Sequence, residues 1–144
     1  MSFSMPTEDD FATLVSRIRK EWPDCVGIGV FGSVARGTPH EGSDVDLLIA
    51  LISGSVISRI LYTRWDEFVA PELKNICWSP HFVECLRENA SAGSLWLEFA
   101  DHGKTLWTTD VFERSFRSLR DEINAGKYER RKEPGSSFYW IKRG

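Results

Sequence analysis

Hydrophobic positions in the first part of the chain change from helical spacing to the continuous run of a buried strand. Apolar residues from Phe11 to Trp22 recur three, four and seven residues apart, as on one face of a helix. The polar start at Thr7 is typical of a helix cap, so we predict a helix from about Thr7 to Trp22, which Pro23 ends. The apolar and β-branched run Cys25–Phe31 then predicts a buried strand.

The rest of the chain continues to alternate between helices and strands. In chain order we predict a short helix over 33–36, a strand over Asp44–Leu51, a helix over 55–72, a strand over Asn75–Ser79 closed by Pro80, a helical segment over 82–101 interrupted near Ala92 and Gly93, a strand over 104–108, and a helix from Asp110 that Gly126 stops. This order predicts an α/β (α+β) fold, with a mixed β-sheet of about four strands packed by helices. Residues 1–126 are expected to form one domain, and residues 127–144 a basic and aromatic C-terminal tail packed on it or extending from it.

Composition adds the size of the protein and its expected location. A chain of 144 residues, 42% of them hydrophobic, is suited to a single domain with a substantial core. No apolar run approaches the roughly 20 residues that cross a bilayer, and the first ten residues lack the order of a signal peptide. We therefore expect a cytoplasmic protein without membrane contact. Three cysteines without CxxC spacing predict buried thiols rather than a zinc site.

The net charge of −3 conceals an uneven distribution along the chain. Residues 1–112 carry 9 basic and 16 acidic side chains, whereas residues 113–144 carry 9 basic and 5 acidic ones. The basic end could hold a phosphate-bearing ligand, or it could simply be the solvated face of a terminal helix. Because the acidic body would repel phosphate, a nucleic acid is not expected as the partner.

A glycine and a serine directly follow the first predicted strand. Gly32 allows the backbone to approach a phosphate closely, and amides at the start of the next helix point outward as anion donors. The Ser33 hydroxyl adds a further donor, and Arg36, one turn along, could add a cation. The turn is therefore a candidate phosphate site, although a Gly-Ser pair alone is weak support.

Two carboxylates begin the second predicted strand. Asp44 and Asp46 are two residues apart, so they project to the same side of the strand. Carboxylate oxygens suit Mg²⁺ bridging the phosphates of a nucleoside triphosphate, whereas an isolated Asp-x-Asp is often only a solvated strand edge. The joint pattern Gly-Ser-x10-Asp-x-Asp arises by chance in about 0.2% of chains of this length. Together the two halves indicate a phosphoryl or nucleotidyl transfer site.

The stretch GVFGSVARGTPHEGSDVDLLIAL, residues 29–51, resembles the motif of the DNA polymerase beta-like nucleotidyltransferase superfamily, in particular its minimal nucleotidyltransferases. By this resemblance Gly32 and Ser33 match the phosphate-binding step, and Asp44 and Asp46 match the catalytic metal ligands. Three further residues match positions that commonly accompany the motif, namely Arg36, Gly37 and Ser43. Of these, the resemblance implies nucleotide contacts for Arg36 and Ser43.

One feature of the superfamily is missing from the predicted site. Its members usually carry a third carboxylate on a later strand, which completes the metal site and can deprotonate the attacking hydroxyl. The predicted strand Asn75–Ser79 contains none, although Glu72 precedes it and Glu84 follows it. His81, after Pro80, could face the same cleft, but the sequence gives no reason to assign it a role.

The resemblance implies a Mg²⁺-dependent enzyme that moves a nucleoside monophosphate, expected to be AMP from ATP, to an acceptor hydroxyl. Many minimal nucleotidyltransferases are antitoxins that adenylylate a tyrosine of a partner HEPN toxin, so such a tyrosine is an expected acceptor. The missing carboxylate leaves an alternative open. The chain would then be a weak or inactive module of the same fold that binds a nucleotide or a partner protein.

Overall fold

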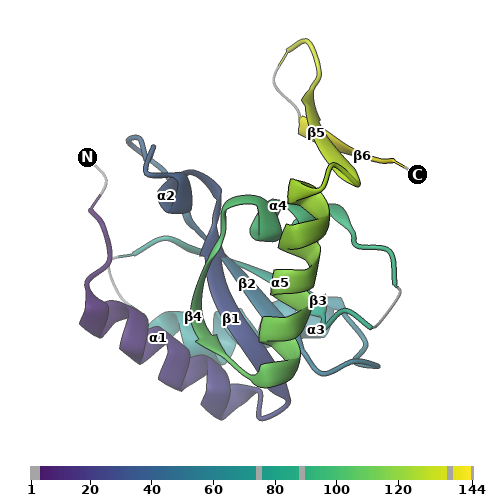
Figure 1. Cartoon of the computed structure of the whole chain (residues 1–144). Helices are drawn as coiled ribbons and strands as arrows, with labels where there is room; N and C mark the ends of the chain where they lie inside the picture. The colour runs from purple at the N-terminus through teal and green to yellow at the C-terminus, as the bar shows by residue number, and fades with distance from the viewer. Residues whose placement is uncertain (1–3, 74–75, 88–89, 136–137, 144) are drawn as a thin grey trace.

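The computed structural model describes residues 4–73, 76–87, 90–135 and 138–143, which form a sheet with helices on both faces and a small hairpin beyond it (Figure 1). The helices are α1 (Glu8–Glu21), α2 (Gly32–Arg36), α3 (Arg59–Arg64), α4 (Ser94–His102) and α5 (Asp110–Asn124). The strands are β1 (Cys25–Phe31), β2 (Val45–Leu51), β3 (Trp78–Glu84), β4 (Lys104–Thr108), β5 (Tyr128–Lys132) and β6 (Phe138–Lys142). Among the described residues, no helix has the length and apolar character needed to cross a membrane.

The main sheet contains four strands in the order β3-β2-β1-β4. β1 pairs antiparallel with β2 and with β4, whereas β2 and β3 run parallel. β5 and β6 form a separate antiparallel pair. The predicted α/β (α+β) fold, with a mixed sheet of about four strands packed by helices, is therefore confirmed.

Residues at the ends of several helices and strands explain where those elements begin and end. The Thr7 hydroxyl accepts a hydrogen bond from the Asp10 amide at 3.1 Å, and the Asp10 carboxylate accepts one from the Thr7 amide at 2.7 Å, so α1 begins with a capping box. Gly37 ends α2 in the left-handed conformation, with φ of 76°. The predicted β1, β2, β4 and α5 are confirmed to within one or two residues at each end.

The third strand was predicted wrongly. It runs from Trp78 to Glu84, with Pro80 inside it, whereas the sequence predicted a strand over 75–79 that Pro80 would close; residue 75 lies outside the described residues. In the described part of the chain, β3 is an edge strand whose one partner is β2. An edge strand tolerates proline because the missing N–H can face away from its neighbour. The helical segment predicted over 82–101 consequently reduces to α4.

The helix predicted over 55–72 is confirmed only in part. It begins four residues later than predicted, at Arg59, and its last turns change geometry. Trp65–Val69 is π-helical and Ala70–Glu72 is a 3-10 turn. Trp65 and Val69 are buried against the sheet, so this irregular end still contributes to the core.

The sheet separates two apolar layers. α1 and α3 cover one face, and α4 and α5 cover the other. On the second face, a side chain at Gly27 would overlap the Phe112 ring, and one at Gly29 would overlap the Phe99 ring. Both rings are fully buried. The two glycines therefore allow α4 and α5 to pack directly on the backbone of β1.

The three cysteines are free thiols. Cys25 and Cys85 are buried, as predicted. Cys77 is exposed, contrary to the prediction, because β3 begins only after it.

The C-terminal tail folds as the β5–β6 hairpin, which projects beyond the end of α5 (Figure 1). Its base is attached to the body: Tyr128 is buried in the layer formed with α4 and α5, and Trp140 packs against that layer. Lys142 donates a hydrogen bond to the Ser91 hydroxyl at 3.2 Å. Residues 136, 137 and 144 of the predicted tail lie outside the described residues.

Gly29→Ala is expected to destabilise the protein by about 1–3 kcal/mol, because the new methyl group overlaps the Phe99 ring in a close-packed layer. Urea unfolding followed by circular dichroism measures the change. Gly29→Ala combined with Phe99→Leu should lose less stability than the sum of the two single variants, since the smaller side chain relieves the overlap. Additive losses, or a Gly29→Ala variant as stable as wild type, would contradict the packing described.

Candidate functional site

Gly32 and Asp46 lie against each other where β1 ends and β2 begins. The antiparallel register pairs Phe31 with Asp46, and the chain then enters α2 at Gly32 with φ of 76°. A side chain at Gly32 would overlap the Asp46 carboxylate, so glycine is required both for the backbone conformation and for the space. The Asp46 side chain is 32% exposed. The structure thus brings together one residue from each half of the predicted motif.

The other predicted residues surround this contact. Ser33 is half-buried at the start of α2, and Asp44 is exposed directly before β2. Ser43 closes the intervening loop through two hydrogen bonds. Its hydroxyl accepts one from the His40 amide at 2.8 Å, and its own amide donates one to the His40 carbonyl at 2.9 Å. This closed loop leads directly into Asp44, the residue before β2.

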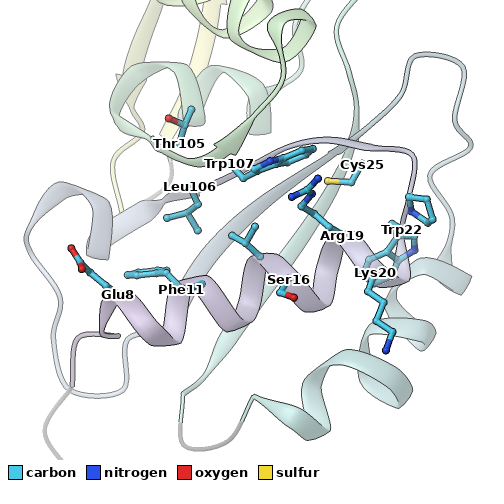
Figure 2. Close-up of a pocket in the computed structure, with 13 residues that line it drawn as sticks. Glu8, Phe11, Ser16, Arg19, Lys20, Trp22, Cys25, Thr105, Leu106 and Trp107 are labelled. Carbon is cyan, nitrogen blue, oxygen red and sulfur yellow. The ribbon is translucent and has the colours of Figure 1, made fainter.

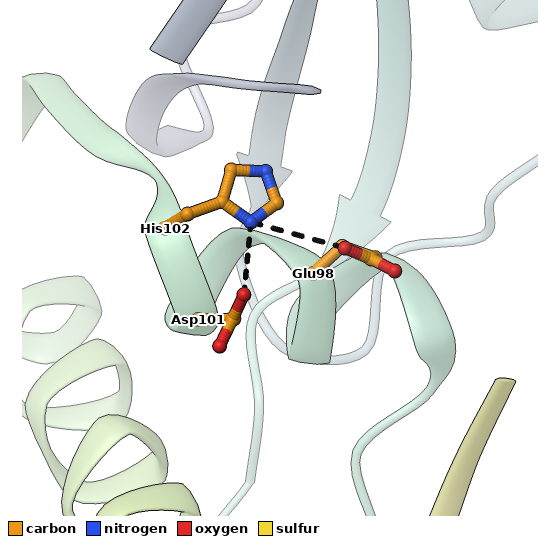
Figure 3. A group of neighbouring side chains, drawn as sticks. All are labelled: Glu98, Asp101 and His102. Carbon is orange, nitrogen blue, oxygen red and sulfur yellow. Dashed lines mark hydrogen bonds and ion pairs between the residues drawn. The ribbon is translucent and has the colours of Figure 1, made fainter. Parts of the chain in front are cut away.

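A histidine that was not predicted as part of the site contacts the glycine turn. The Gly32 amide donates a hydrogen bond of 2.9 Å to His102 Nε2, from the end of α4. His102 Nδ1 lies 3.2 Å from an Asp101 carboxylate oxygen and 3.8 Å from a Glu98 oxygen (Figure 3). Since Nε2 accepts, the ring is neutral and carries its proton on Nδ1. α4 therefore satisfies the first amide of the turn.

Glu98 connects three parts of the fold. Its carboxylate accepts a hydrogen bond of 3.2 Å from Arg36 of α2 and one of 3.0 Å from Arg130 of β5. The Arg36 side chain is 33% exposed, so solvent still reaches it. The predicted phosphate-binding arginine is thus held beside the turn by α4. No local pattern identifies this pairing, because the partners are far apart in the chain.

His81 of β3 lies beside Asp46. Its Nε2 is 3.3 Å from an Asp46 carboxylate oxygen. The two glutamates that flank the predicted third strand are elsewhere: Glu72 pairs with Arg17 at 3.1 Å, and Glu84 lies at the opposite end of β3. The side chain that faces Asp46 from β3 is therefore an imidazole and not a third carboxylate.

A cavity of about 940 Å³ lies between α1 and β4, apart from this site (Figure 2). Its lining includes Arg19, whose guanidinium carbon is 4.2 Å from the centre of the Trp107 ring. None of the predicted site residues lines it. The shape of the protein surface therefore does not by itself identify the Gly32–Asp46 contact.

A family model described as "Nucleotidyltransferase domain" matches residues 12–87. This span is more than half of the chain and contains both the glycine turn and the two aspartates. The chain belongs to the nucleotidyltransferase domain family. The family predicted from residues 29–51 is thereby confirmed. No curated protein sequence matches the chain significantly.

Solved structures share the fold of this chain. A chain of a toxin–antitoxin complex with AMP-PNP is 21% identical, with a TM-score of 0.54 over 81% of this chain and 91% of that one. A chain of the tri-AMPylated Shewanella oneidensis HEPN toxin in complex with MNT antitoxin is 17% identical, with a TM-score of 0.51 over 84% and 92%. At these identities the likeness concerns the fold alone.

Nucleotidyltransferases generally use a divalent metal ion, and two groups of side chains in this domain have ligand chemistry. The ligand atoms of Glu98, Asp101 and His102 lie within 4.8 Å of one another, but Glu98 is already paired with two arginines. Asp46 is paired with no arginine or lysine in the described part of the chain, and its carboxylate occupies the space that a Gly32 side chain would fill. The Asp46 side of the site therefore fits a cation better.

Lowering the pH is expected to destabilise this nucleotidyltransferase domain through His102. Burial lowers the pKa of His102 below its ordinary value of 6.5, and Arg36 adds to this, although Asp101 and Glu98 oppose it. The unfolded state then binds the proton more readily. The stability that depends on neutral His102 is full above about pH 6.5 and is lost as the pH falls through the lower folded-state pKa.

Urea unfolding between about pH 7.5 and 5.0, for wild type and for His102→Gln, measures this effect. Glutamine does not titrate, so wild type should lose stability more steeply with falling pH than the variant. Parallel pH profiles would contradict the buried neutral imidazole.

Proposed function

We propose that the protein is a Mg²⁺-dependent nucleotidyltransferase that moves AMP from ATP to an acceptor hydroxyl. The observation that carries this proposal is the contact between Asp46 and the Gly32 turn. A cation held by that carboxylate would lie next to the donors that bind phosphate, as phosphoryl and nucleotidyl transfer requires. Membership in the nucleotidyltransferase domain family supports the reaction class.

The phosphates of ATP are proposed to bind at the start of α2. The Gly32 amide already donates a hydrogen bond to His102. The donors that remain for phosphate are the backbone amides that follow Gly32 in α2 and the Ser33 hydroxyl. Arg36 keeps free N–H groups, since a guanidinium has five and Glu98 accepts one of them. The Ser43 hydroxyl accepts from the loop backbone but can still donate its own hydrogen to the nucleotide.

Asp44 and Asp46 are proposed to hold Mg²⁺, which would neutralise the triphosphate and stabilise the leaving oxygen. In the transfer, the acceptor oxygen forms a bond to the α-phosphorus, and the bond from that phosphorus to the α–β bridging oxygen breaks. Pyrophosphate leaves with the electron pair, and the hydroxyl proton passes to water. The chain contributes by fixing Asp46 against the turn, so that phosphate and cation are held in one place.

A tyrosine of a HEPN-type partner protein is the proposed acceptor. The similar fold of a chain from the complex of an AMPylated HEPN toxin with its MNT antitoxin supports this class of partner. We also propose that residues 1–126 are the nucleotidyltransferase domain and residues 127–144 an added element packed on it. The attachment of the hairpin through Arg130, Tyr128 and Trp140 is consistent with that division.

One observation favours a second candidate function. His81 lies beside Asp46, where a third carboxylate would complete the metal site of an active relative. A chain that lacks that general base would bind a nucleotide or a partner protein and transfer little or no AMP. The general base of an enzyme contributes about a hundred-fold or more in rate, so the two functions differ measurably.

Incubation with radiolabelled ATP and Mg²⁺, alone and with the protein encoded by the neighbouring gene, distinguishes these functions. Asp44→Asn and Asp46→Asn are each expected to reduce label transfer about a hundred-fold or more, because each removes a metal ligand. The matched control is Asp24→Asn, an exposed carboxylate at the opposite end of β1, which should transfer label like wild type.

Transfer that survives both substitutions would contradict the site. ATP binding without transfer under every condition would favour the inactive module. Absence of both nucleotide binding and metal dependence in wild type would contradict the assignment of the site itself.

A further inference from the structure

We propose that His81 joins Asp46 as a protein ligand of the metal site, and that its nitrogen makes the site prefer Mn²⁺ to Mg²⁺. This inference rests on the proposed function, in which Asp46 holds the metal. It extends that function because it assigns a ligand of a different chemical class and states which ion binds more tightly.

The separation of the two side chains suits ligands of a single ion. His81 Nε2 lies 3.3 Å from the Asp46 carboxylate oxygen. Two ligand atoms that are each about 2.1 Å from an ion, at right angles, are about 3.0 Å apart. A small rotation of either side chain would therefore bring both atoms to one cation. The two side chains are each about one third exposed, so an ion can reach them from solvent.

The fold presents Nε2 of His81 to Asp46. β3 runs parallel to β2, with Ser79 opposite Asp46, and His81 follows two residues later on the same face of β3. The Phe31 ring packs edge-on against the imidazole, with the ring centres 5.3 Å apart. The Ser79 hydroxyl lies 3.4 Å from the same nitrogen. Packing and register together therefore orient the ring before any ion binds.

Neither Glu72 nor Glu84 supplies the missing ligand. Glu72 pairs with Arg17, and Glu84 lies at the far end of β3. Among the described residues, His81 is the one side chain that forms an ion pair or hydrogen bond with Asp46. The position that would complete the metal site is thus held by nitrogen.

A nitrogen ligand changes which ion the site prefers. Mg²⁺ is a hard cation that prefers oxygen ligands and octahedral geometry. Imidazole suits first-row transition ions, and Mn²⁺ also accepts carboxylate and water oxygen. Replacing a carboxylate by neutral imidazole also removes a negative charge, which weakens the attraction for Mg²⁺. A site in which an imidazole joins the Asp46 carboxylate therefore favours Mn²⁺.

Pulsed electron paramagnetic resonance of bound Mn²⁺ tests the ligand directly. The protein is loaded with Mn²⁺ and a non-hydrolysable ATP analogue, and nitrogen-14 couplings are recorded for wild type, His81→Ala and the control His40→Ala, an exposed loop histidine. Wild type and the control should show a directly bound imidazole nitrogen, and His81→Ala should lack it. Competition titrations should show Mn²⁺ binding weakened about tenfold or more in His81→Ala.

His81→Asp provides a second variant, with an oxygen ligand in place of nitrogen. It is expected to bind Mg²⁺ more tightly than wild type does. Thermal melts of both His81 variants check that the fold is retained. Wild-type Mn²⁺ without the nitrogen coupling, or equal Mn²⁺ affinity in wild type and His81→Ala, overturns the inference.

Asp46→Asn separates this inference from the proposed function. If Asp46→Asn loses the metal while His81→Ala retains full affinity and spectrum, only the role of His81 fails. If Asp46→Asn also retains the metal, or wild type binds none, the proposed metal site fails with it.

Discussion

The close approach of α4 and α5 to the backbone of β1 determines where the site residues lie. Phe99 and Phe112 occupy the space that side chains at Gly29 and Gly27 would fill, so the helices pack directly on the strand. This depth of packing brings His102, at the end of α4, within hydrogen-bonding distance of the first amide of α2. Any change that moves α4 outward would therefore loosen the turn as well as the core.

The ten residues between Ser33 and Asp44 follow from the register of β1 and β2. Phe31 is opposite Asp46, so the chain must leave the sheet, form α2 and return within that span. Gly37 ends the helix in a conformation that a side chain would strain, which makes the return possible. The spacing of the motif is thus a consequence of one short helix inserted into an antiparallel connection, and it places the carboxylate over the turn.

Much of the fold could be predicted because its limits are set by local residues. Pro23 separates α1 from β1, and the apolar run Cys25–Phe31 is long enough to identify a buried strand. The same local rule failed at Pro80, because whether proline ends a strand depends on whether that strand is at the edge of the sheet. His81 was expected to be able to face the cleft but received no role, because its contact with Asp46 depends on the register of a parallel pair that no local pattern specifies.

Glu98 makes the C-terminal hairpin part of the electrostatics of the site. The Glu98 carboxylate accepts hydrogen bonds from Arg130 of the hairpin and from Arg36 of α2. It also lies 3.8 Å from Nδ1 of His102. Without Arg130, the full negative charge of Glu98 would act on the other two groups, holding Arg36 more firmly and favouring protonation of His102. Shortening the tail would thus alter the phosphate-binding turn even if the hairpin never touched a substrate. The hairpin is connected to the site by charge as well as by packing.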